Sequence, residues 1–182
     1  MERAALPEEI RTNRLRLRPY ELGDVDDVFA YARDPEWSRY LRMLPRPYEL
    51  DDAERFVARQ ILVDRTVHPV WAIVLDDAVV GGINLRFRFE HGLAEMGYAL
   101  ARAHWNRGLC SEAARAVVDA AFAAHHDLNR IQARADARNG ASQRVMEKIG
   151  MTREGVLRMS RIEGGEVMDE AWFAILRPEW AG

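Results

Sequence analysis

LAEMGYALARAHWNRGLCSEAARAVVDAAFAAH, residues 93–125, is the stretch that decides how this chain folds. It opens with a strand-like run, Leu93–Leu100, and continues through Arg107-Gly108 into a helix that reaches His125. That helix gathers its core residues on one side at Ala114, Val118, Ala121 and Phe122. A further strand is expected at 130–135. A strand, a helix and a strand in this order predict a parallel crossover within a mixed sheet.

Upstream of this unit the sequence predicts two more strands and, before them, two helices. The strands are expected at 70–75 and 79–89, where apolar residues dominate and turn residues flank each run. The first helix follows Asp24 as its candidate cap. The second is expected behind a capping box formed by Asp51 and Glu54.

Near its beginning the chain alternates leucines with arginines over residues 12–19, which predicts a strand of period two. Arg14, Arg16 and Arg18 then share one face. We interpret this face as the ordinary solvent-exposed face of a strand rather than as a basic patch for binding. Residues 1–11 are expected to be an N-terminal tail.

The remaining segments complete a mixed α/β fold. A loop is expected at 34–48, a helix at 141–149 ending at Gly150, and a hairpin around Glu163-Gly164-Gly165. The resulting sheet is mostly antiparallel and is flanked by helices. Because no repeat or linker divides the chain, residues 1–182 are expected to form a single domain.

Composition excludes several classes of protein. The chain is 48% hydrophobic and 30% charged, as ordinary globular proteins are, and its net charge of -3 argues against a dedicated nucleic-acid binder. No run approaches the ~18 apolar residues of a membrane span. One cysteine makes no internal disulfide, and the five histidines form no metal pattern. A cytoplasmic protein without a metal is expected, and a homodimer is left open.

The loop at 105–112, Trp-Asn-Arg-Gly-Leu-Cys-Ser-Glu, carries the first indication of chemistry. Glycine before a helix lets the backbone approach a ligand, and the first helical amides lie at a positive dipole end. These features suit a phosphate, with Arg107 as an additional cation. A simple turn explains the same residues. The nucleotide-binding glycine patterns are missing.

Five segments together resemble the GCN5-related N-acetyltransferase (GNAT) superfamily, in particular its branch of ribosomal-protein N-terminal acetyltransferases. They are Thr-Asn-Arg-Leu-Arg-Leu-Arg-Pro at 12–19, Ala-Glu-Met-Gly-Tyr-Ala-Leu at 94–100, Trp-Asn-Arg-Gly-Leu-Cys-Ser-Glu-Ala at 105–113, Asn139 to Met151, and Glu-Gly-Val-Leu-Arg at 154–158. The resemblance extends from Thr12 to Trp180. It implies the GNAT fold, with a splayed strand pair that holds acetyl-coenzyme A.

In that superfamily the pyrophosphate of coenzyme A lies on the loop matching 105–110, and the pantetheine arm runs beside the strand matching 96–100. The resemblance places the cofactor between the strands near Leu100 and Arg130. A glycine at 97 within that strand agrees with close approach of a ligand, although a packing glycine is the alternative. The residues implied at the cofactor are Met96, Tyr98, Leu100, Trp105, Asn106, Arg107, Gly108, Leu109, Cys110, Ser111, Asn139 and Ser142. Asn139 has a rival role as a helix cap.

Three positions depart from the superfamily pattern. Trp105 stands where glutamine or arginine is common, although tryptophan is usual in the resembled branch. Cys110 stands where a small residue is usual, and a thiol at a helix N-terminus can have a depressed pKa. Direct acetyl transfer in the family favours a structural role for this cysteine over a nucleophilic one. Met146 stands where many members have a tyrosine that acts as the acid. In the resembled branch a serine matching Ser142, one helical turn earlier, takes the acid role; binding its own backbone is the alternative.

An attacking amine has to lose a proton, so a base is expected near it. Glu95 beside the cofactor strand is our candidate, and an ordinary polar strand residue is the alternative. A main-chain amide near 96–98 would stabilise the oxyanion.

The resemblance implies an acetyl-coenzyme A-dependent N-acetyltransferase acting on a primary amine, such as a protein N-terminal α-amine. Two alternatives remain. One is a polyamine or amino-sugar acetyltransferase, which an acidic pocket around Glu36, Glu49 or Asp51 would favour. The other is a coenzyme A-binding module without turnover. Acceptor determinants are expected at 37–48 and 160–167.

Overall fold

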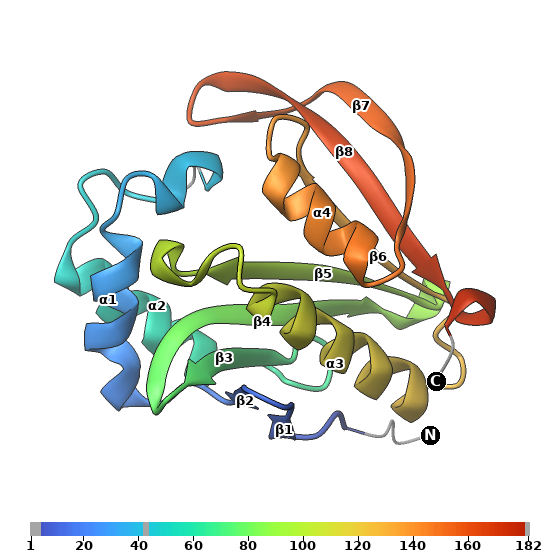
Figure 1. The fold of residues 1–182 in the computed structure, drawn as a ribbon, viewed down its shortest axis with the longest axis horizontal. Coiled ribbons are helices and arrows are strands. Elements are labelled where there is room, and N and C mark those ends of the chain that lie inside the picture. The colour runs from blue at the N-terminus through green and yellow to red at the C-terminus, as the bar shows by residue number, and fades with distance from the viewer. Residues whose placement is uncertain (1–4, 42–43, 181–182) are drawn as a thin grey trace.

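The computed structural model describes residues 5–41 and 44–180, which form one mixed sheet with helices on both faces (Figure 1). The strands are β1 (Ile10–Arg11), β2 (Arg16–Arg18), β3 (Val70–Leu75), β4 (Ala78–Arg88), β5 (Leu93–Leu100), β6 (Arg130–Asp136), β7 (Thr152–Glu163) and β8 (Glu166–Leu176). The helices are α1 (Val25–Ala32), α2 (Leu50–Ile61), α3 (Leu109–Ala124) and α4 (Gly140–Lys148).

The strand order is β1-β2-β3-β4-β5-β6-β8-β7. Every neighbouring pair is antiparallel except β5 and β6, which are parallel and joined through α3. The predicted mixed α/β fold, mostly antiparallel with one parallel crossover, is therefore confirmed.

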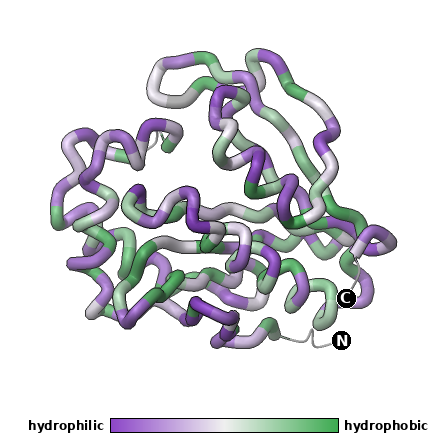
Figure 2. The backbone as a smooth tube through the Cα atoms, in the orientation of Figure 1, coloured by the Kyte–Doolittle hydropathy of each residue, from purple (hydrophilic) through white to green (hydrophobic). Residues whose placement is uncertain are grey.

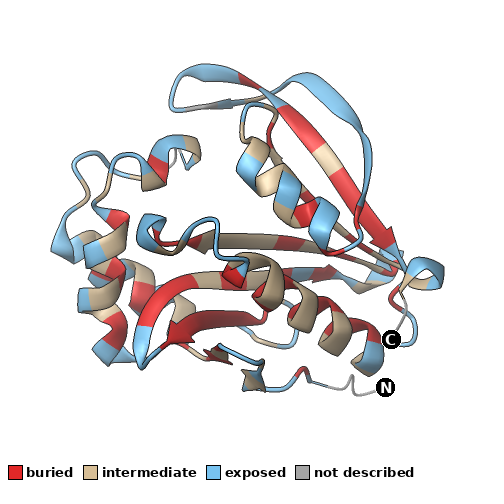
Figure 3. Ribbon diagram, in the orientation of Figure 1, coloured by how far each residue is buried: buried red, intermediate tan, exposed pale blue. Residues whose placement is uncertain are grey.

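The middle of the sheet is buried on both faces. β3 is buried along its whole length (Figure 3). Its successive side chains point to opposite faces, so Trp71 and Ile73 join the core beneath α3, whereas Ala72 and Val74 join a second core beneath α1 and α2. Hydrophobic residues accordingly run along the central strands in Figure 2. The site forms within the sheet, between the neighbouring strands β5 and β6.

The predicted N-terminal tail is wrong for its described part. Leu6 is buried in the core, and Ile10–Arg11 pairs with β2. The indole Nε1 of Trp71 donates a hydrogen bond to the carbonyl of Pro7 at 3.1 Å. Residues 1–4 lie outside the described part. Leu6 packs against the core because burial removes its apolar side chain from water.

The solvent-facing interpretation of the arginines at 14, 16 and 18 fails at Arg18, whose guanidinium is buried. It forms two hydrogen bonds with the carboxylate of Asp24, at 2.8 and 2.7 Å. Asp24 is therefore not a side-chain cap for α1: its Oδ2 accepts from the backbone amide of Glu21 instead, at 2.8 Å.

The capping box of α2 lies two residues earlier than predicted. Glu49 and Asp52 form it, and Asp51 pairs with Arg55 on the helix surface. The sequence allows a capping box at either position, because acidic residues occupy both pairs of sites. The extended backbone at Glu49 identifies that residue as the N-cap. Gly150, with φ of 87°, follows α4 in the left-handed conformation expected of a terminating glycine.

Candidate functional site

The site lies where β5 and β6 separate. The two strands pair over only four positions each, Leu93–Met96 with residues 130–133. Beyond Met96 both strands diverge and line a cavity, with α4 beside it (Figure 1). The splayed pair is thus present, but its opening is at the Leu100 end and beside Arg134. The expected position near Arg130 is wrong, because Arg130 lies at the paired end, opposite Leu93.

The cavity has a volume of about 590 Å³. All sequence-predicted site residues line it apart from Arg107, namely Glu95, Met96, Tyr98, Leu100, Trp105, Asn106, Gly108, Leu109, Cys110, Ser111, Asn139 and Ser142. Sequence reasoning missed other lining residues, including Arg134 and Glu170, whereas Tyr40 falls within the acceptor determinants expected at 37–48.

The loop before α3 has a defined backbone shape. Asn106 and Gly108 both adopt left-handed φ values, 59° and 76°. This turns the chain so that Gly108 immediately precedes the first turn of the 16-residue helix α3. The indole of Trp105 donates a hydrogen bond to the carbonyl of Leu100 at 2.6 Å, which fixes the loop to the end of β5. Amides at such a helix start suit an anion.

Arg107 does not line the cavity. Its side chain is exposed, and its Nη1 lies 3.2 Å from Nδ1 of His104. Arg107 is exposed at the protein surface, so local sequence pattern did not indicate the direction of its guanidinium.

Tyr98 and Ser142 meet across the cavity wall. The Tyr98 hydroxyl lies 3.0 Å from the backbone carbonyl of Ser142 and 3.0 Å from its Oγ. A carbonyl only accepts, so the phenol donates its proton there and its oxygen is left to accept from the serine hydroxyl. Burial raises the pKa of Tyr98, which keeps the phenol protonated.

Asn139 fills the rival role considered for it: its Oδ1 accepts from the backbone amide of Ser142 at 3.1 Å and caps α4. This cap holds Ser142 in the first turn, facing the cavity. Met146, one turn later, is buried in the core and does not line the cavity.

The depressed thiol pKa considered for Cys110 is wrong. Burial raises the pKa of its thiol to about 12, and the residue packs against the core. Loss of hydration on burial disfavours the charged thiolate. Cys110 is therefore an apolar lining residue, as its small size suggested.

Alkylation tests this environment. Because the thiolate is the reacting form, we expect iodoacetamide to modify Cys110 at pH 8 at least about 100-fold more slowly than a free cysteine peptide. Mass spectrometry of the native protein measures the rate, and urea-unfolded protein serves as the reactive control. Equal rates for native protein and peptide would contradict the raised pKa.

Opposite Tyr98, on the other face of β5, Glu95 belongs to a chain of charges. Its Oε1 lies 3.1 Å from Nε of Arg134, whose Nη1 lies 3.2 Å from Oε2 of Glu170. Glu170 is buried and also accepts from the Ser160 hydroxyl at 2.6 Å. Glu170 lies two residues after Met168 on β8, so strand alternation places both side chains on the same face, and Met168 is buried. A charged residue on a buried face was the available signal for Glu170.

A short 3-10 turn, Trp37–Tyr40, lies over the cavity mouth. The Tyr40 hydroxyl donates to the carbonyl of Arg138 at 3.3 Å, joining this turn to the segment before α4. Residues 42–43 of the expected loop lie outside the described part. The expected hairpin determinants contribute Arg161 to the cavity wall.

The described residues hold no group of three or more histidine, cysteine, aspartate or glutamate side chains arranged for a metal. Within residues 5–41 and 44–180, no helix has the length and apolar character needed to cross a membrane.

Comparison with known proteins agrees with this geometry. The chain matches the acetyltransferase (GNAT) domain family over residues 14–152. The uncharacterised N-acetyltransferase p20 of Bacillus licheniformis is 32% identical over 179 residues, covering 96% of this chain and 99% of that protein. A GNAT-family acetyltransferase structure from Bacillus anthracis has a TM-score of 0.82 at 30% identity, covering 94% of this chain and 99% of that one. The ribosomal α-N-protein acetyltransferase RimL, solved with coenzyme A, has a TM-score of 0.77 at 18% identity, covering 95% and 98%. At 18% identity the last likeness concerns the fold.

Proposed function

Because this chain belongs to the GNAT family of N-acetyltransferases, we propose that it transfers the acetyl group of acetyl-coenzyme A directly to a primary amine. The observation that carries the proposal is the cavity between the separated strands, which joins the start of α3 to the free end of β5. Those two features match the two parts of the donor, an anionic pyrophosphate and an extended pantetheine arm.

The pyrophosphate would lie at the loop of residues 105–111. Left-handed Asn106 and Gly108 turn the chain into α3, and the amides of its first turn have no partner within the helix. Gly108 also has open space where a side chain would begin, its nearest neighbour being Arg14 at 3.6 Å. The residues therefore fit the group.

The pantetheine arm would run along β5 beyond Met96, where the ladder to β6 has ended. A chain carrying amides in this position pairs with the strand edge as an added strand does. The arm would lead the thioester toward Ser142, with a main-chain amide near residues 96–98 as the oxyanion donor.

Two side chains take the proton-transfer roles in this proposal. The amine nitrogen forms a bond to the thioester carbon and the carbon–sulfur bond breaks. Glu95 accepts the amine proton, directly or through water, and Ser142 supplies a proton to the leaving thiolate. Arg134 holds Glu95 at 3.1 Å and keeps its carboxylate turned toward the cavity.

Charge at the acceptor side supports a protein N-terminal α-amine over a polycation. Of the lining carboxylates, Glu95 and Glu170 share Arg134 and Asp136 pairs with Arg138, so this wall is not strongly acidic. Glu36, Glu49 and Asp51, which an acidic small-molecule pocket would use, do not line the cavity. We therefore assign the protein α-amine first and polyamines or amino sugars second.

Acetyl transfer to a panel of N-terminal peptides, polyamines and aminoglycosides tests the proposal, with released thiol as the readout. We expect turnover with peptides and little with polyamines. Coenzyme A binding without turnover on any amine would instead identify a regulatory module.

Replacing Ser142 separates catalysis from binding. We expect Ser142→Ala to lower kcat by about 100-fold, the low end for general acid catalysis because a thiolate leaves readily, with the Kd for acetyl-coenzyme A changed less than threefold or so. Tyr98→Phe keeps the ring and removes only the hydroxyl that orients Ser142, so a smaller fall in kcat is expected. A loss of donor affinity without a loss of kcat would make Ser142 a binding residue.

A further inference from the structure

The turn between β1 and β2 is hydrogen-bonded to the first turn of α3. The Thr12 hydroxyl donates to Oε1 of Glu112 at 2.6 Å, and the backbone amide of Arg14 donates to the same oxygen at 2.9 Å. The Arg14 guanidinium completes the contact at Oε2, with Nε at 2.7 Å and Nη2 at 2.6 Å. Four donors thus converge on one carboxylate from a segment about a hundred residues away.

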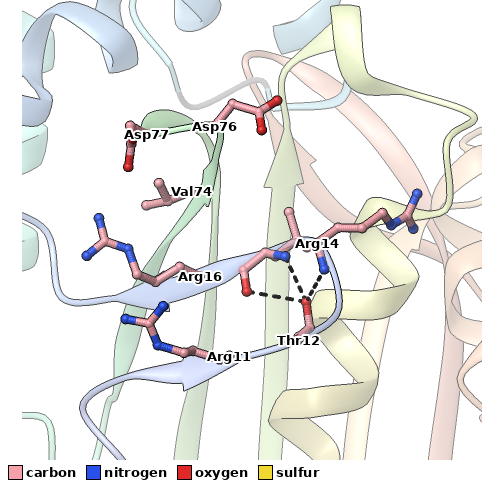
Figure 4. A pocket seen from close by; sticks show the side chains of 8 residues that line it. Arg11, Thr12, Arg14, Arg16, Val74, Asp76 and Asp77 are labelled. Atoms are coloured by element: carbon pink, nitrogen blue, oxygen red, sulfur yellow. Dashed lines mark hydrogen bonds between the residues drawn. The ribbon is translucent and has the colours of Figure 1, made fainter.

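Arg14 also reaches the loop itself. Its Nη1 donates to the carbonyl of Arg107 at 3.0 Å. That carbonyl lies between Asn106 and Gly108, the two residues with left-handed φ values. Figure 4 shows the direction: Arg11 and Arg16 turn toward a shallow hollow beside Asp77, whereas Arg14 extends away from them toward the start of α3.

Glu112 presents an electrostatic problem for anion binding. It lies in the first turn of α3, the end that would receive a pyrophosphate. Partial burial raises the pKa of its carboxyl, but the hydrogen bonds from Thr12 and Arg14 outweigh burial and hold the pKa below its ordinary value. Glu112 is therefore ionised, and its charge would oppose a bound anion unless a cation offsets it.

We propose that Arg14 is a positioning residue for the acetyl donor. It holds the carbonyl of Arg107, so that the loop keeps its left-handed turns and its amides face the cavity, and it offsets the charge of Glu112. It does this from outside, since Arg14 does not line the cavity. This inference rests on the proposed function, because it assumes that the loop binds the pyrophosphate.

Calorimetric titration of coenzyme A into the purified protein tests the inference. We expect Arg14→Gln to raise Kd by about tenfold or more, since it removes charge-assisted contacts to the loop and leaves Glu112 uncompensated. Arg14→Lys restores a cation but not the contact to Arg107, so an intermediate Kd is expected. Arg16→Gln, at a half-exposed arginine in the adjoining strand β2, is the matched control and should bind as the wild type does.

A second variant separates charge from shape. Arg14→Gln combined with Glu112→Gln removes the unbalanced carboxylate and should recover part of the lost affinity. In steady-state assays KM for the donor should rise, while kcat and KM for the amine change less than about twofold. Wild-type affinity in both Arg14 variants, or equal losses in all kinetic constants, would overturn the positioning role. Failure of the wild type to bind coenzyme A would overturn the proposed function instead.

Discussion

Gly108→Glu is expected to abolish measurable binding of acetyl-coenzyme A. Gly108 has φ of 76°, which a side chain makes costly, and it precedes the α3 amides that would bind the pyrophosphate. Glutamate would add a negative charge beside two phosphate charges in the same small space. Both effects act against the same ligand, so the Kd should rise by about 1,000-fold or more. Calorimetry or retention on immobilised coenzyme A measures this.

Two controls divide the effect into its causes. Gly108→Ala adds strain without charge, and should weaken binding by about tenfold. Gly23→Glu adds the same charge where nothing lies within 4 Å and the backbone is unstrained, so affinity should not change. Unchanged affinity in Gly108→Glu would remove the loop from the donor site. Loss of binding with a lowered Tm in Gly108→Glu alone would point to misfolding, and Gly108→Ala would then decide.

Local pattern predicted what local physics determines. The strands 70–75 and 93–100 agree residue for residue with β3 and β5, because short runs rich in apolar residues and bounded by turn residues have few alternatives. Gly150 ends α4 as expected for the same reason, since few other residues adopt its φ of 87°. The lining role of the 105–111 loop followed from its place between strand and helix, once the resemblance had given it a ligand.

Contacts between distant segments were beyond the reach of the pattern. The pairing of Arg134 with Glu170 depends on which strands become neighbours, and the pairing of Arg14 with Glu112 depends on α3 packing beside the turn between β1 and β2. The expected position of the cavity near Arg130 failed for the same reason: the register of β5 on β6 decides which end opens. Hydrophobic alternation gives the face of each residue on its strand but not the partner that the residue meets there.

Arg18 shows this limit most clearly, and replacing it should cause a large loss of stability. Its period-two spacing in the sequence matches that of Arg14 and Arg16, yet its guanidinium is buried against Asp24 and donates to the carbonyl of Pro19 at 2.9 Å. Arg18→Met would leave the buried carboxylate of Asp24 without its cation. Removing one partner of a buried pair costs roughly 3–5 kcal/mol. For a chain of this size the Tm should fall by roughly 10 °C.

Thermal unfolding of three variants distinguishes pairing from simple loss of a side chain. Arg16→Met, on the same strand but half-exposed, should change the free energy of unfolding by less than about 0.5 kcal/mol. Combining Arg18→Met with Asp24→Asn removes the unpaired charge while the amide oxygen still accepts from the backbone amide of Glu21. The double variant should therefore recover at least about half of the lost stability, because an uncompensated buried charge, rather than the absence of an ion pair, causes most of the loss. An Arg18→Met protein as stable as Arg16→Met would show that water reaches Asp24 and that the pair is not buried in solution.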